Sequence, residues 1–255
     1  VLAFITLYIY LHIIAKTKQL DNFEKKDVED FLVGAIISMI IGARLFHVFV
    51  YNPTYYFMRP WEILMVWQGG LSFHGALVLI GLWVYYFCKK RNINFLEMTD
   101  ALVIPTAIFL SLGRLANYAN SELVGKITNV SWAVNFTNSP YEGFRHPTQI
   151  YESIKNLFVF GVLIAAKAIQ THVFRKTIPG LLTAIFLIGY GSLRFFIEFL
   201  KEGAIVILGL NMGQILSIAT LLFGGYILYV VLKTRKDLLK AHQPRKSKQK
   251  EKGRK

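Results

Sequence analysis

Long runs of apolar residues dominate the chain, and short clusters of charged residues separate them. Seven of these runs approach or reach the roughly 20 residues that a helix needs to cross the hydrocarbon core of a bilayer. Because the runs are continuous instead of alternating, they predict helices and not membrane-spanning strands. The pattern therefore predicts an all-α integral membrane protein, a seven-transmembrane-helix bundle. Its helices fall near residues 1–16, 31–51, 71–88, 100–119, 150–170, 178–200 and 212–232.

The longest polar connection covers about residues 120–149, between the fourth and fifth runs. Residues 131–136 alternate between apolar and polar side chains before Ser139-Pro140, which predicts a short strand and a turn. We expect this connection to form a small external cap on one transmembrane domain of residues 1–232. The chain starts at Val1 inside an apolar run and without an initiator methionine, so we also expect further residues to precede Val1 in the natural protein.

Composition agrees with the membrane interpretation, since 54% of the residues are hydrophobic, 17% are charged and the mean hydropathy is +0.43. The single cysteine, Cys88, excludes a disulfide framework and a cysteine-based metal cluster within this sequence. Histidines and carboxylates do not recur at metal-ligand spacing. The sequence therefore predicts neither a metal nor another cofactor.

Basic residues give the predicted bundle an orientation, because Lys and Arg accumulate on cytoplasmic flanks. Of the 29 basic residues, 21 follow the first, third, fifth and seventh runs. Five lie on the opposite side, namely Arg59, Lys126, Arg145, Lys155 and Lys201. We therefore expect the N-terminus outside and the C-terminus in the cytoplasm. Residues 233–255 hold eleven basic and two acidic residues. They predict a disordered cytoplasmic tail that binds anionic lipids and not nucleic acid.

Ionisable side chains inside the apolar runs are candidate functional groups, because charge is costly in hydrocarbon unless it is paired or hydrated. Arg44, His47, His74, Arg114 and Arg194 all lie within about 11 Å of the expected external boundary at 1.5 Å per helical residue. The inner halves of the runs carry no charge over long stretches. This distribution indicates a pocket that opens to the outer leaflet, and not a transmembrane path.

Spacing within the runs indicates an anion site. Tyr190, Arg194 and Glu198 recur every four residues and so share one helical face, while Arg114 and Asn117 lie three apart. Two Arg residues at one depth predict a phosphate ligand, because the guanidinium fork donates two parallel hydrogen bonds.

Structural alternatives remain open at several of these positions. Arg44 near a helix end can extend to the membrane interface, and Arg194 can form an ion pair with Glu198. His47 can be a packed, hydrogen-bonded histidine. His74 differs, because Gly69, Gly70 and Gly75 around it let a ligand or another backbone approach closely.

The segment Gly113-Arg114-Leu115-Ala116-Asn117-Tyr118-Ala119-Asn120-Ser121-Glu122-Leu123-Val124-Gly125 strongly resembles the signature of the prolipoprotein diacylglyceryl transferase family. Further resemblance covers Gly69–Gly75, His146–Glu152, Gly189–Gly191 with Arg194 and Glu198, and Met212–Gln214. These blocks occur in the order of the family. Small departures, such as Ala76, Ala116 and Tyr118, change side-chain volume near these motifs.

The resemblance implies a bacterial cytoplasmic-membrane enzyme whose active site faces the outer leaflet. Such enzymes transfer the diacylglyceryl group of phosphatidylglycerol to the lipobox cysteine of a prolipoprotein and release glycerol phosphate. By this resemblance the catalytic residues are His74, Arg114 and Arg194. It also implies that the substrate is bound by Arg114, Asn117, Glu122, Gly125, Tyr190, Arg194 and Glu198.

His74 fits the role of the base that takes the thiol proton, although a carboxylate stays an alternative. Arg114 and Arg194 fit the stabilisation of a phosphate leaving group. Two rival functions are an anion transporter with a basic vestibule and a membrane scaffold that uses its tail to recruit acidic partners. Acyl-chain preference and oligomeric state do not follow from the sequence.

Overall fold

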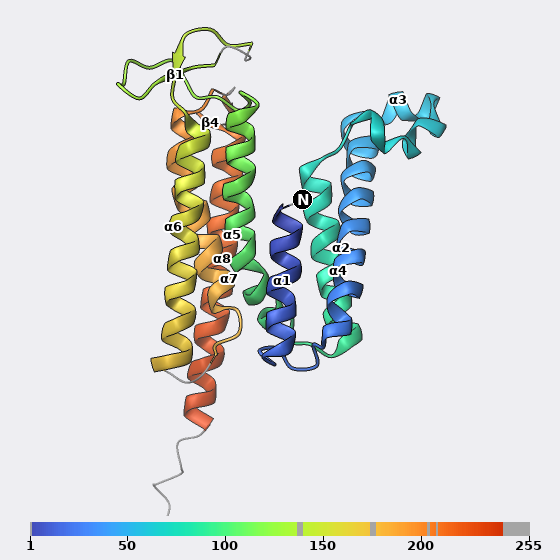
Figure 1. The fold of residues 1–255 in the computed structure, drawn as a ribbon, viewed down its shortest axis with the longest axis vertical. Coiled ribbons are helices and arrows are strands. Elements are labelled where there is room, and N and C mark those ends of the chain that lie inside the picture. Colours follow the sequence, from blue (N-terminus) through green and yellow to red (C-terminus); the bar gives the residue numbers. More distant parts are fainter. Residues whose placement is uncertain (1, 137–139, 174–176, 203–204, 208, 242–255) are drawn as a thin grey trace, which may run out of the picture. The chain divides into compact units, whose positions relative to one another are not determined.

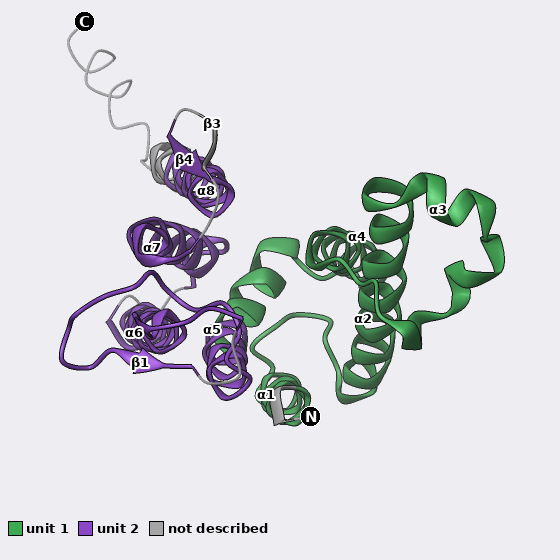
Figure 2. Cartoon of the chain, turned by 90° about the horizontal axis from the view of Figure 1, so that it is seen from above, with its two compact units in different colours: residues 1–105 green, residues 106–255 purple. Residues whose placement is uncertain are grey.

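A computed structural model describes residues 2–136, 140–173, 177–202, 205–207 and 209–241 of the chain. The chain forms two compact units, residues 1–105 and residues 106–255 (Figure 2). Both units are mostly helical.

The first unit consists of helices joined by a long irregular connection. Helix α2 is continued by a π-helical turn, η1, and several short helical turns follow before α4. The elements are α1 (Leu2–Lys16), α2 (Lys25–Phe46), η1 (His47–Tyr51), α3 (Pro53–Met58), η2 (Pro60–Leu64), η3 (Val66–Gln68), α4 (Phe73–Arg91) and the beginning of α5 (Phe95–Ala119).

Helices α2 and α4 lie side by side because two glycines meet where they cross (Figure 1). A Cβ atom added at Gly42 would overlap the carbonyl of Gly75, and one added at Gly75 would overlap the carbonyl of Gly42. The same unit buries a core that includes Phe31 and Phe87, whose rings meet edge to face at 5.2 Å. The close approach of the α2 and α4 backbones, together with this core, holds in place α4, the helix that carries His74.

The second unit holds the end of α5 and three further long helices. Helix α7 packs against both α6 and α8 (Figure 1), and Ser111 of α5 shares a hydrogen bond of 2.7 Å with Ser153 of α6. The helical elements are α6 (Thr148–Ala168), η4 (Ile169–Val173), α7 (Leu181–Ile197), η5 (Glu198–Leu200) and α8 (Met212–Ala241).

Two small antiparallel sheets lie at one end of the second unit. Strands β1 (Val134–Asn135) and β2 (Phe144–Arg145) pair with Val134 opposite Arg145. Strands β3 (Ile205–Ile207) and β4 (Leu210–Asn211) precede α8. The predicted strand over residues 131–136 is therefore present only as two residues. The predicted turn includes Ser139, which lies outside the described residues.

All seven predicted runs coincide with helices, and five segments among the described residues are long and apolar enough to cross a membrane. Helix α1 is shorter than these five, and α4 ends in Lys89, Lys90 and Arg91. A multi-pass, mostly helical membrane protein is thus supported, while seven crossings and an external cap stay predictions. The five segments are Lys25–Tyr51, Phe95–Ala119, Thr148–Val173, Leu181–Leu200 and Met212–Thr234.

The start of the predicted disordered tail needs correction. Helix α8 continues to Ala241, so residues 233–241 are helical. These residues are rich in Lys, Arg, Leu and Ala, which favour helix, and they extend a helix that has already nucleated. Residues 242–255 lie outside the described part of the chain, and there the prediction stays untested.

Candidate active site

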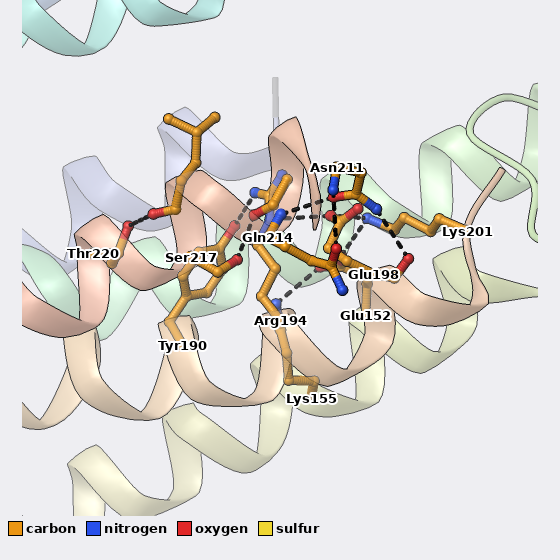
Figure 3. A network of polar contacts seen from close by, with 12 residues as sticks. Glu152, Lys155, Tyr190, Arg194, Glu198, Lys201, Asn211, Gln214, Ser217 and Thr220 are labelled. Atoms are coloured by element: carbon orange, nitrogen blue, oxygen red, sulfur yellow. Dashed lines mark hydrogen bonds and ion pairs between the residues drawn. The ribbon is translucent and has the colours of Figure 1, made fainter. Parts of the chain in front are cut away.

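A continuous chain of ion pairs joins Arg114 to Arg194 in the second unit. The Arg114 Nε atom lies 3.6 Å from one oxygen of Glu152, and Lys201 Nζ lies 2.6 Å from the other. The same ammonium group is 2.9 Å from Glu198, whose Oε1 atom is 3.2 Å from Arg194 Nε (Figure 3). The two arginines of the sequence prediction therefore share one network.

Lys155 adds a further cation to this network. Its ammonium group donates a hydrogen bond of 2.9 Å to Glu152 Oε2 and lies 3.9 Å from the centroid of the Tyr190 ring. Tyr190 in turn accepts a hydrogen bond of 2.8 Å from Arg194 Nη1. The side chain of Lys155 is 3% exposed and that of Glu152 is fully buried. Lys155 thus fixes both the carboxylate beside Arg114 and the phenol beside Arg194.

Helical spacing explains how the sequence builds the network. Glu152 and Lys155 are three residues apart in the first turns of α6. Arg194 in the last turn of α7 and Glu198 at the start of η5 are four residues apart. The Arg194–Glu198 ion pair, which the sequence left as a structural alternative, is present. It is one part of a larger network, and so it does not remove Arg194 from the candidate site.

The loop after α5 is held in an irregular conformation by the beginning of α6. Ser121 and Leu123 both have positive φ angles, 57° and 55°, which are uncommon outside glycine. Thr148 Oγ1 donates to the Leu123 carbonyl at 3.0 Å, and Gln149 Nε2 donates to the Glu122 carbonyl at 2.5 Å. These contacts give the residues of His146–Glu152 a role in shaping the signature loop.

Asn117 and Glu122 meet at the mouth of this loop. Asn117 Nδ2 donates a hydrogen bond of 2.8 Å to Glu122 Oε2, and the Glu122 amide donates to the Asn117 carbonyl at 2.9 Å. Glu122 is exposed. The pair therefore presents an oriented carboxylate and amide at the surface of the second unit, close in sequence to Arg114.

At two positions of the motifs, glycine is required because neighbouring atoms leave no room for a side chain. A Cβ atom at Gly125 would lie 2.6 Å from the His146 carbonyl oxygen and 2.8 Å from the Leu200 carbonyl oxygen. A Cβ atom at Gly213 would overlap the carboxylate of Glu198. Glycine at these positions lets the loop after α5 and the start of α8 pack against the network.

His74 belongs to the first unit, near the start of α4. Ser72 is the N-cap of that helix, and its hydroxyl accepts from the Gly75 amide at 3.5 Å. The Nδ1 atom of His74 shares a hydrogen bond of 3.2 Å with Tyr51 Oη. The ring is exposed, with Phe46 also nearby at 6.4 Å between centroids. The hydrogen bond between Tyr51 and Nδ1 therefore orients the imidazole ring.

Arg44 does not extend to the surface. It is 4% exposed, and its guanidinium donates to four backbone carbonyls of the connection before α4. The distances are 2.5 Å to Glu62, 2.9 Å to Ile63, 2.7 Å to Gly69 and 3.2 Å to Gly70. The membrane-interface alternative is therefore wrong, because these carbonyls compensate the buried charge.

His47 stays within the same connection. Its Nε2 atom is 3.2 Å from Asn52 Nδ2, and its ring meets the rings of Tyr51 and Tyr56 edge to face. A Cβ atom at Gly70, whose φ angle is 68°, would lie 2.8 Å from both His47 and Arg44. These contacts favour the structural interpretation of His47.

A model of the prolipoprotein diacylglyceryl transferase family matches residues 1–230. The chain belongs to this family. A phosphatidylglycerol–prolipoprotein diacylglyceryl transferase of Rickettsia typhi is 44% identical over 221 residues, which cover 83% of this chain and 84% of the relative. The protein of the same name from Rickettsia felis is 41% identical over 208 residues, with 80% and 79% covered. That of Rickettsia bellii is 38% identical over 214 residues, with 82% and 79% covered.

The sequence did not predict three charged residues of the Arg114–Arg194 network as site residues. Lys155 and Lys201 entered the sequence prediction only as basic residues of the external side, and Glu152 only as the end of a motif. The signal that could have found two of them is the spacing of three residues between Glu152 and Lys155 at the start of an apolar run. The contacts of Lys201 depend on the turn after α7, which spacing alone does not predict.

Proposed function

We propose that this protein transfers the diacylglyceryl group of phosphatidylglycerol to the cysteine thiol of a prolipoprotein lipobox and releases glycerol phosphate. Membership of the transferase family supports this reaction. The observation that carries the site is the buried network in which Arg114 and Arg194 are tied together through Glu152, Lys201 and Glu198.

The network binds the phosphate of the lipid. Arg114 and Arg194 are only partly exposed, at 16% and 22% of their side-chain surface, and ion pairs hold both. Fixed donors in such a place need no reorganisation when charge develops on a leaving group, which is why they lower the barrier effectively. Tyr190 and Glu198 orient Arg194, while Asn117, Glu122 and Gly125 shape the adjoining loop.

In the reaction, the thiol sulfur attacks the diacylglyceryl carbon. A carbon–sulfur bond forms, the carbon–oxygen bond to the phosphate breaks, and glycerol phosphate leaves with that bond's electron pair. His74 takes the thiol proton. If Nδ1 donates to Tyr51 Oη, then Nε2 has a free lone pair for this proton.

The bundle crosses the bacterial cytoplasmic membrane seven times, with the N-terminus outside and the C-terminus in the cytoplasm. Lys and Arg residues support this orientation because most of them follow alternate apolar runs. The active site then faces the outer leaflet, where an exported lipobox cysteine meets phosphatidylglycerol. Residues 120–149 form the external cap, and the basic C-terminal residues bind anionic lipid at the cytoplasmic face.

A transfer assay with purified protein tests this function. Radiolabelled phosphatidylglycerol and a lipobox peptide are incubated with the parent or with His74→Ala, Arg114→Ala or Arg194→Ala. We expect labelled thioether peptide from the parent and a loss of at least about 100-fold in each variant, since each removes a group that acts in the transition state. A peptide with Ser in place of Cys is the control.

Absence of transfer by folded parent protein contradicts the proposal. Flux of glycerol phosphate through protein-containing liposomes, without transfer, supports the rival function of an anion transporter instead.

A further inference from the structure

The network that joins Arg114 and Arg194 carries more positive than negative charge. Its cations are Arg114, Lys155, Arg194 and Lys201, and its carboxylates are Glu152 and Glu198. Two positive charges are therefore in excess. None of these six side chains is more than 22% exposed.

The described surroundings do not supply the two missing negative charges. Glu202, next in the chain to Lys201, pairs with Arg145 at 2.9 Å, so this neighbouring pair is neutral. Helix α8 and the strand before it contribute uncharged groups, namely Asn211, Gln214 and Ser217 (Figure 3). Glu122 is exposed and bonded to Asn117.

An uncompensated charge is costly to bury, and two are more so. Polar atoms along α6 are also incompletely satisfied, because both amide atoms of buried Asn156 and the Oε1 atom of Gln149 have no hydrogen-bond partner among the described residues. A site of this kind is completed by a ligand with two negative charges, and water satisfies the remaining polar atoms.

The charges of the two phosphate species in the proposed reaction differ. Phosphatidylglycerol contains a phosphodiester with one negative charge, whereas the released glycerol phosphate is a monoester. Its second ionisation has a pKa of about 6, so above that pH it carries nearly two charges. The ligand gains its second charge as the carbon–oxygen bond breaks.

We propose that the network matches the dianion of a phosphate monoester and binds it in preference to a diester, with buried Lys155 as a third cation beside the two partly exposed arginines. This inference rests on the proposed function. It means that the excess positive charge of the network is balanced by the leaving group and not by the lipid substrate. Interactions that strengthen only as charge develops raise kcat without tightening substrate binding.

The test is direct binding to the purified full chain in lipid nanodiscs, by calorimetry at pH 8. The monoester probe is glycerol phosphate, and the diester probe is glycerophosphoglycerol, the phosphatidylglycerol headgroup without acyl chains. We expect the monoester to bind at least about tenfold more tightly, because Coulomb energy scales with ligand charge. The preference should decline below about pH 6, where the monoester loses its second charge.

Variants locate the effect. Lys155→Met should weaken monoester binding about 100-fold and diester binding about tenfold, since the lost Coulomb energy is twice as large for the dianion. Lys155→Arg keeps the charge and should keep the preference. Lys167→Met removes a charge about 18 Å further along the same helix and should leave both affinities unchanged. If Lys155→Met does not fold, then Lys201→Met provides the same test with a less buried residue.

Equal binding of the two probes by the parent overturns the inference, as does an unchanged preference in folded Lys155→Met or an equal loss in Lys167→Met. These binding results can be distinguished from a failure of the proposed function. A parent that transfers lipid to the peptide but does not distinguish the probes retains the transferase proposal and loses this one.

Discussion

Replacing Glu152 by Gln tests whether the buried network holds the site together. Glu152 is fully buried and contacts three cations, Arg114, Lys155 and Lys201. The substitution keeps the size of the side chain but leaves four cations, of which Lys155 is buried and the others are partly exposed, with one carboxylate. Breaking buried pairs in this way costs about 3–5 kcal/mol, which for a chain of this size lowers Tm by roughly 6–20 °C.

Activity should fall as well, because Glu152 is the carboxylate that positions Arg114. Loss of that position should lower kcat/KM by about 10- to 100-fold. Thermal unfolding in detergent and the peptide transfer assay measure the two effects. Glu142→Gln is the control, since Glu142 is an exposed carboxylate in the same unit. Removing one cation as well, in Glu152→Gln with Lys155→Met, should recover part of the stability.

If Glu152→Gln melts within 2 °C or so of the parent and transfers lipid at the parental rate, then the network neither stabilises the unit nor positions Arg114. A double variant that is no more stable than the single one contradicts the charge-balance argument in particular.

Three further changes have distinct expected outcomes. Arg44→Leu removes a guanidinium that donates to four carbonyls, so the connection before α4 should become sensitive to limited proteolysis; unchanged cleavage rates contradict this role. Cys88→Ser should retain full transfer activity, because the thiol is buried in the core of the first unit; a folded but inactive variant contradicts that assignment. Gly213→Ala should lower activity and Tm, since its methyl group overlaps the Glu198 carboxylate. The control Gly225→Ala meets no neighbouring atom and should stabilise α8 by about 0.5–1 kcal/mol. Equal effects of the two substitutions refute the close-packing explanation.

Hydrophobic patterning predicted the long helices well because span length is a local property of the sequence. The end of α8 was missed for a physical reason. Polarity marked residue 233 as the start of a tail, but the residues that follow favour helix and prolong the apolar segment to Ala241. The short strands were predicted less well, since pairing of Val134 with Arg145 depends on a partner eleven residues away.

Within the candidate site, helical spacing predicted contacts along one helix and missed contacts between elements. The Arg194–Glu198 pair follows from a spacing of four residues. The bonds of Arg44 to carbonyls 18 to 26 residues away do not follow from any local pattern. Lys155 was not predicted as a site residue because basic residues near the end of an apolar run usually lie in water. In the structure its ammonium group contacts Glu152 and Tyr190 instead.

The central claim is that the network of Arg114 and Arg194 binds the phosphate of phosphatidylglycerol, and photolabelling tests it most directly. A phosphatidylglycerol with a photoreactive diazirine in its glycerol headgroup is bound to the full chain and irradiated, and labelled peptides are mapped by mass spectrometry. We expect label in the peptides that hold Arg114 or Arg194, and loss of that label when unlabelled phosphatidylglycerol competes. Label that unlabelled phosphatidylglycerol displaces, but that lies far from both arginines in the second unit, contradicts the claim.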